Sequence, residues 1–107
     1  MIEIMNMRTV KPTESGDIKV DRSSVLGNPF FMDNEYERDE ICDKYQVMFD
    51  KIIRQGVVLC EKDAAFMREI GRLIIIHKIY GKLRLFCWCS PLRCHAETIK
   101  QYLESVV

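Results

Sequence analysis

The feature that most constrains the fold is a strand pattern that runs directly into a helix signal near the end of the chain. Residues 83–89, Leu-Arg-Leu-Phe-Cys-Trp-Cys, alternate with the two-residue period of a β-strand. Apolar side chains on both faces near its end predict an interior strand of a sheet that is covered on both sides. Ser90 and Pro91 then suit a helix N-cap and first helical position. This order indicates an α/β domain, whose ligand sites lie at the carboxyl ends of strands.

Two other segments have strand character. Alternation over residues 2–7 predicts a first strand, and residues 18–21 predict a second, which we expect to pair with the first as a hairpin. Residues 57–60 fit either a short buried strand or the approach to a helix. Residues 11–17 contain Pro, Ser and Gly and predict a loop.

Three apolar stripes recur at helical spacing, over residues 41–53, 66–77 and 95–106. Asn34 and Glu37 have the spacing of a capping box before the first, and Gly56 and Gly81 suit helix ends. These elements predict one domain over residues 1–107. Its fold class is α/β, a small Rossmann-like three-layer domain with a short, mostly parallel sheet of three to four strands and about three helices.

Composition excludes several classes of function. Sixteen basic residues balance sixteen acidic ones, and this zero net charge disfavours an extended nucleic-acid surface. The longest strongly apolar run, residues 73–76, is far shorter than the roughly 20 residues that span a bilayer. Residues 1–10 lack the apolar core of a signal peptide. We therefore expect a cytoplasmic protein without membrane contact, and apolar stripes on three helices are compatible with a homodimer.

The segment 87–95, Cys-Trp-Cys-Ser-Pro-Leu-Arg-Cys-His, contains three of the five cysteines and one of the two histidines. In a cytosol these thiols stay reduced. One hypothesis is a zinc site made by Cys87, Cys89, Cys94 and His95, because Zn²⁺ takes cysteine and histidine tetrahedrally. The spacing argues against it, since known zinc fingers bring the second ligand pair from a distant element. Zinc is therefore the less favoured reading.

A second hypothesis is a nucleophilic thiolate, because a cysteine beside a helix N-terminus has a stabilised anion. Five residues separate Cys87 from Arg93, as in the cysteine phosphatase loop, but the glycines of that loop are missing. The third hypothesis is packing, since cysteine is often a small buried residue. His95 is a better functional candidate than the cysteines, although a buried histidine without a chemical role is equally compatible with its position.

The segment 20–30, Val-Asp-Arg-Ser-Ser-Val-Leu-Gly-Asn-Pro-Phe, has neither helical nor strand periodicity and predicts a structured loop. Arg22 can hold phosphate or carboxylate with its planar fork, and Ser23 and Ser24 can donate to anionic oxygens. Gly27 and Asn28 tolerate left-handed backbone geometry. The alternative is a turn in which Asp21 and Asn28 satisfy the amides of the loop itself.

Three motifs together resemble a known family. Arg22-Ser-Ser-Val-Leu-Gly-Asn-Pro-Phe30 is followed by the acidic, arginine-containing helix start of residues 38–45, and then by Cys87-Trp-Cys-Ser-Pro and Cys94-His95. This combination, over residues 20–103, resembles the domain-of-unknown-function family 4326, small proteins of bacteria and their phages. The closing motif is similar to that of another uncharacterised α/β family, which implies a Rossmann-like sheet. The resemblance also weakens the phosphatase reading, because the family does not usually have arginine at position 93.

The leading functional hypothesis is a protein that binds a small nucleotide-like or other phosphate-bearing ligand, either as a binding module or as a simple enzyme that also processes it. The expected ligand-binding residues are Asp21, Arg22, Ser23, Ser24, Gly27, Asn28, Cys89 and Ser90, and the expected catalytic residues are His95 and Cys94. The phage distribution of the family implies a factor that counters host nucleotide signalling. The alternative is a non-catalytic protein-interaction module, with or without a stabilising Cys/His zinc site, and a thiol-dependent hydrolase is a third possibility.

Overall fold

The computed structural model describes residues 1–89 and 92–107 and confirms a small α/β fold. Within this part of the chain, three strands and three α-helices follow in the order β1 (Ile2–Asn6), β2 (Asp17–Lys19), α1 (Arg38–Phe49), α2 (Glu61–Tyr80), β3 (Leu83–Cys87) and α3 (Ala96–Val106). A 3₁₀ turn precedes α1, and a π-helical segment continues it. None of the helices described has the length and apolar composition that crossing a membrane requires.

The sheet has the strand order β1-β3-β2, and both outer strands run parallel to the central β3. The predicted parallel sheet is confirmed, but the predicted hairpin between residues 2–7 and 18–21 is wrong. The loop 7–16 brings the chain back before β2 begins, so β2 runs in the same direction as β1 and pairs with the opposite side of β3. All three carboxyl ends therefore point to the same edge of the sheet.

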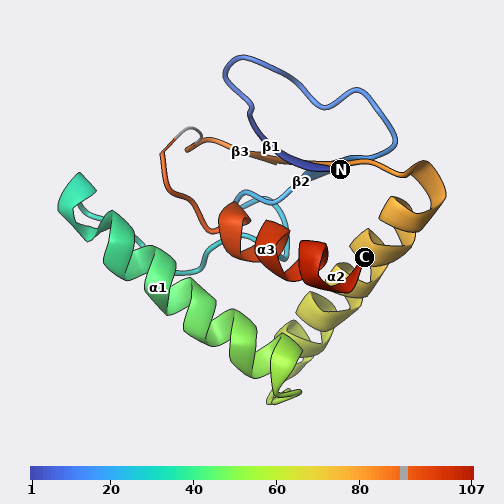
Figure 1. Ribbon diagram of the computed structural model, residues 1–107. Helices are drawn as coiled ribbons and strands as arrows, with labels where there is room; N and C mark the ends of the chain where they lie inside the picture. Colours follow the sequence, from blue (N-terminus) through green and yellow to red (C-terminus); the bar gives the residue numbers. More distant parts are fainter. Residues whose placement is uncertain (90–91) are drawn as a thin grey trace.

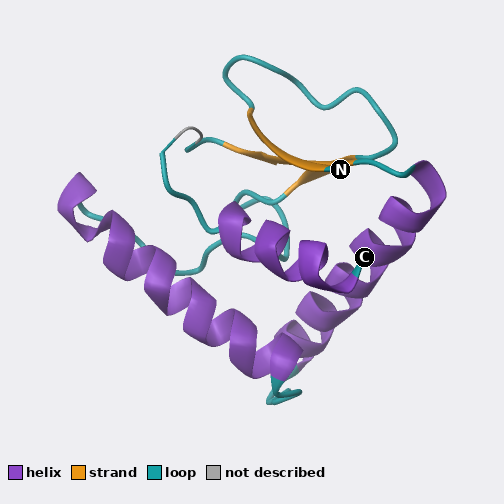
Figure 2. Cartoon of the chain, in the orientation of Figure 1, coloured by secondary structure: helices purple, strands orange, loops and turns teal. Residues whose placement is uncertain are grey.

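The two faces of the sheet have different covers. The three α-helices lie on one side of the sheet, whereas the loop 7–16 arches over the other (Figures 1 and 2). The three-layer prediction is thus corrected to helices on one face only. The second face is mostly polar on the outer strands, where Glu3, Asp17 and Lys19 lie beside Arg84 and Phe86, and Met5 is the apolar exception. Such a face has too little apolar surface to bury a helix.

A buried ion pair anchors that second face. Both Nε and Nη2 of Arg84 donate to the carboxylate of Asp17 at 2.7 Å, and the Asp17 side chain is only 1% exposed. This bidentate pair holds the pKa of Asp17 well below its usual range. The pair joins β2 to β3 across the sheet, on the side away from the helices.

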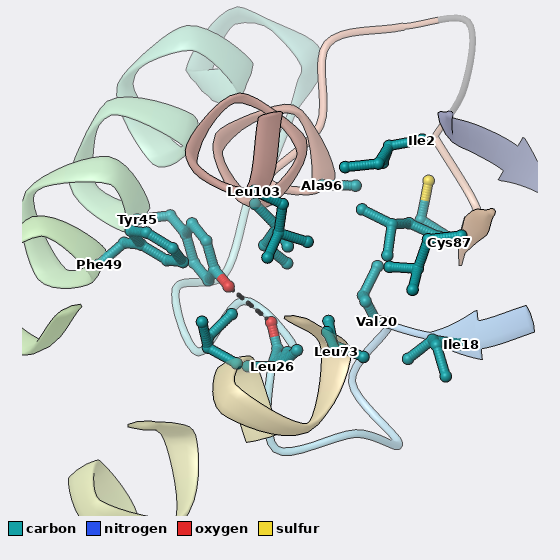
Figure 3. Packing of buried hydrophobic residues seen from close by; sticks show 14 of the residues in the cluster. Ile2, Ile18, Val20, Leu26, Tyr45, Phe49, Leu73, Cys87, Ala96 and Leu103 are labelled. Atoms are coloured by element: carbon teal, nitrogen blue, oxygen red, sulfur yellow. Dashed lines mark hydrogen bonds between the residues drawn. The ribbon is translucent and has the colours of Figure 1, made fainter. Parts of the chain in front are cut away.

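The hydrophobic core lies between the sheet and the helices (Figure 3). Its largest fully buried side chains on the helix side are Tyr45, Phe49, Leu73, Leu83, Leu85, Ile99 and Leu103, together with Val20 and Leu26 from the loop after β2. The Tyr45 hydroxyl donates to the carbonyl oxygen of Leu26 at 2.8 Å, as Figure 3 shows. This buried hydrogen bond fixes the loop 20–30 against α1.

Helix ends agree only partly with the sequence. Asn34 caps the 3₁₀ turn through Tyr36 N–H at 3.0 Å, as predicted, whereas Glu37 accepts from Asp33 N–H rather than closing a full capping box. Gly81, with φ of 69°, ends α2. Residues 57–60 form a loop rather than a strand.

The start of the last helix differs from the prediction. The predicted cap, Ser90-Pro91, lies outside the described residues, and α3 begins only at Ala96 with His95 at its N-cap. Residues 92–95 are not helical, because their backbone and side chains bond to α1 and to Val20 instead. The site described below therefore contains a longer connecting segment than the sequence suggested.

Gly27 is the glycine on which the loop 20–30 depends. A Cβ at this position would lie 2.4 Å from the carbonyl oxygen of Asp21 and 2.7 Å from Cα of Arg22. We expect Gly27→Ala to lower the free energy of unfolding by about 1–3 kcal/mol, because the backbone must move. Gly71→Ala is the matched control, since a Cβ there meets nothing within 4 Å in the interior of α2. In urea unfolding, the control should be unchanged or more stable by up to about 1 kcal/mol. Equal losses of unfolding free energy in both variants would contradict the role given to Gly27.

Candidate functional site

A pocket of about 390 Å³ opens where the strands β2 and β3 end. Its walls come from the loop 20–30, the end of β3, the start of α1 and the residues just before α3. The two segments singled out in the sequence thus meet in one cavity, although they are far apart in the chain. Of the predicted site residues, those that line the pocket are Asp21, Arg22, Ser23, Asn28, Cys87, Cys89, Cys94 and His95.

Two predicted binding residues have structural roles in the loop instead. The Ser24 hydroxyl accepts a hydrogen bond from Leu26 N–H at 3.0 Å, and Gly27 permits the close approach of the backbone at Asp21. Ser90, the last of the predicted binding residues, lies outside the described residues. Asn28 belongs to both groups, because it lines the pocket while its Oδ1 accepts from Phe30 N–H at 2.9 Å.

Two hydrogen bonds join the loop 20–30 to the segment 87–95. Trp88 Nε1–H donates to Oδ2 of Asp21 at 2.9 Å, and the His95 ring, through Nε2, bonds to the Val20 carbonyl oxygen at 2.5 Å. Burial acts to raise the pKa of Asp21, but hydrogen bonds from Ser23 and Trp88 outweigh it and hold this pKa below its ordinary value. Asp21 therefore stays ionised and orients the indole ring at the pocket wall.

His95 is buried between the loop and α1. Its ring meets Tyr45 edge to face with centroids 4.9 Å apart, and its Nδ1 lies 3.5 Å from the Cys94 sulfur. Since a carbonyl oxygen can only accept, Nε2 carries the proton in this bond. Burial lowers the pKa of His95, so the neutral ring prevails near pH 7. The catalytic role proposed for His95 and Cys94 stays a prediction, whereas their contribution to closing the pocket is observed.

Arg38 is a site residue that the sequence did not single out. Its Nη1–H donates to the carbonyl oxygen of Arg93 at 2.9 Å, and Nε–H and Nη2–H each donate to Glu35 at 2.8 Å. The same guanidinium lines the pocket together with Cys89 and lowers the pKa of that thiol. The sequence showed only an arginine in an acidic helix start, which is typical of a solvated surface. The long-range contact with Cys89 depends on the tertiary fold.

Three cysteines of the segment 87–95 lie together but in different environments. Cys89 is half-buried, and hydrogen bonds from the Cys94 thiol and Arg38, with the positive charge of Arg38, lower its pKa to about 6. Cys94 is buried, and its hydrogen bonds to Cys87 and Cys89, together with burial, raise its pKa strongly. Cys89 is consequently the thiolate of the group, and Cys94 is the protonated partner.

The metal and phosphatase hypotheses find no geometric support in the described residues. No group of three or more His, Cys, Asp or Glu side chains within residues 1–89 and 92–107 is placed to hold a metal ion. Arg93 turns its guanidinium to α1, where Asp39 and Asp43 accept at 2.9 and 2.8 Å. An arginine paired with two carboxylates is poorly placed to cradle a phosphate against Cys87, which is itself buried on β3.

Fold and site define a small parallel α/β protein with a pocket at the carboxyl ends of its strands. The chain matches the family model described as "Domain of unknown function (DUF4326)" over residues 5–105, so the protein belongs to this family. The resemblance stated from the sequence is thereby confirmed. No curated protein and no solved structure matches the chain.

Burial of His95 should make stability depend on pH. Because the pKa of His95 is lower in the folded state than in the unfolded chain, the unfolded state binds the proton first. Stability is therefore full above about pH 6.5 and falls as the pH drops below it. His95→Gln keeps a donor for Val20 and cannot be protonated, so its stability should fall less between about pH 7.5 and pH 5. Urea unfolding of the wild type and of His95→Gln at each pH measures the two stabilities. If stability fell equally with pH in both proteins, His95 would not be the source of the pH dependence.

Proposed function

We propose that the pocket binds a small nucleotide-like ligand that carries phosphate. The observation that carries this proposal is that Arg22 and Arg38, from separate elements, line a mainly apolar cavity, whereas the third arginine of its lining, Arg93, is bonded to Asp39 and Asp43. A pocket of this kind can hold a planar apolar group while a few polar groups fix its orientation. Its position at the carboxyl ends of parallel strands is where open α/β sheets commonly bind their ligands.

Arg22 is the proposed phosphate anchor. Its Nη2–H donates to the Phe30 carbonyl oxygen at 3.2 Å, and its guanidinium lies 4.1 Å from the centre of the Phe31 ring. These contacts hold the side chain at the pocket, and no carboxylate of the described residues 1–89 and 92–107 forms an ion pair with it, so its charge is available for an anion. Arg38 contributes a second positive group from the start of α1, although Glu35 and Cys89 already balance part of its charge.

The base of a nucleotide would lie against the apolar wall. Phe30, Met32, Ile41 and the indole of Trp88 line this part of the cavity. The Trp88 ring is held by Asp21, so it offers a fixed surface on which a planar base can stack without first being ordered. Phosphate at Arg22 and a base near Trp88 would use both the charged and the apolar lining of the pocket.

The proposal can be tested through the fluorescence of Trp88, the only tryptophan of the chain. Titrations with ADP, AMP, adenosine and inorganic pyrophosphate separate the contributions of base and phosphate. We expect ADP and AMP to change the fluorescence with saturation, and adenosine to bind more weakly. Arg22→Gln should weaken ADP binding about tenfold, the loss expected for a charge-assisted hydrogen bond.

The matched control is Arg68→Gln. Arg68 is exposed on α2, pairs with Glu61 and does not line the pocket, so this variant should bind ADP like the wild type. Isothermal titration calorimetry gives an independent measure of the same affinities. Absence of binding by all four probes, or equal affinities of Arg22→Gln and the wild type, would contradict the proposal.

A further inference from the structure

The pocket brings together cysteines from two parts of the chain. Cys42 from α1 and the three cysteines of the segment 87–95 all line it, whereas Cys60 lies exposed before α2. Phosphate binding gives no reason for this concentration of sulfur. Within the group, interactions with Cys87 and Cys89 raise the pKa of Cys94, and all three thiols line the same pocket.

Access and charge distinguish the members of this group. Cys87 and Cys94 are 1% and 3% exposed, so a solute reaches them poorly. Cys89 is partly exposed at the pocket wall, and Arg38 lines the same pocket and favours the thiolate form of Cys89. An accessible thiolate beside a cation and next to a second, protonated thiol is the arrangement found in peroxide-sensing cysteine pairs.

We propose that Cys89 and Cys94 form a redox-active pair, in which a hydroperoxide oxidises Cys89 and Cys94 then forms a disulfide with it. In the first step the Cys89 thiolate attacks the peroxide oxygen, the O–O bond breaks, and a sulfenic acid forms while the leaving oxygen takes a proton as water or alcohol. In the second step the Cys94 sulfur displaces the hydroxyl of the sulfenic acid, and one water leaves. Two electrons pass from the two sulfurs to the peroxide, which is the oxidant.

Arg38 assists the first step. Its positive charge stabilises the Cys89 thiolate before oxidation. The Cys94 proton has an acceptor nearby, because Nδ1 of His95 lies 3.5 Å from the Cys94 sulfur. Reduction by a small thiol would restore the pair by exchange at the more accessible sulfur, Cys89. This redox site does not depend on the proposed nucleotide ligand.

Trypsin provides a direct test on the whole protein. Cleavage after Arg84, Arg93 and Lys100 places Cys87 and Cys89 on one peptide and Cys94 on the next. The reduced protein is treated with hydrogen peroxide, blocked with N-ethylmaleimide, digested and analysed by mass spectrometry. We expect the two peptides to appear as one species joined by a disulfide, which dithiothreitol separates. Fragment ions should place the bond at Cys89.

Three variants make the assignment specific. Cys89→Ser should abolish the joined species, and Cys60→Ser should leave it unchanged. In Cys94→Ser the sulfenic acid on Cys89 should persist and be trapped by dimedone. Because Cys94→Ser removes a buried thiol, the fold of this variant is checked by circular dichroism. The peptide test on the wild-type protein does not depend on this variant.

Alkylation gives a second, independent readout. Iodoacetamide at about pH 6 should modify Cys89 about tenfold faster than the exposed Cys60, because the thiolate is the reacting species. Equal rates at the two positions would overturn the proposal. So would a joined species whose disulfide involves Cys87, or a protein whose two peptides stay separate after peroxide treatment.

Discussion

The central strand β3 is the constraint on which the rest of the structure depends. It pairs in parallel with β1 on one side and β2 on the other, so the chain must return to the same end of the sheet before each new strand begins. The loop 7–16 makes one return, and α1 and α2 make the other. All carboxyl ends consequently meet at one edge, and the segments that follow β2 and β3 are brought into contact there.

Contact between these segments is held by a few directional bonds over a hydrophobic core. Val20 receives a hydrogen bond from His95, Leu26 receives one from Tyr45, and Asp21 accepts from Trp88. The bonds of His95 and Tyr45 are buried and satisfy polar groups that the fold takes out of water, so their loss would be costly. The same bonds give the pocket fixed walls, with Trp88 oriented before any ligand arrives.

Charge in the site is arranged by elements that are distant in sequence. Arg38 belongs to the start of α1, but its guanidinium reaches Cys89 and the carbonyl oxygen of Arg93. Arg93 in turn binds back to Asp39 and Asp43, so each arginine fastens α1 to the segment before α3. One arginine therefore stabilises a thiolate in the pocket, while the other serves as a tie between elements. The two arginines thus join the same two elements but have different roles in the site.

The sequence by itself determined the elements and the two segments of the site. Apolar periodicity located β1, β3 and all three helices, and the glycine- and serine-rich loop 20–30 and the cysteine-rich segment 87–95 stood out by composition. Local patterns carry this information because helical and strand periods are properties of neighbouring residues. Only the tertiary structure decided the partner of β2, the late start of α3 and the roles of Arg38 and Cys89. These depend on contacts between residues far apart in the chain, and such contacts produce no periodic pattern in the local sequence.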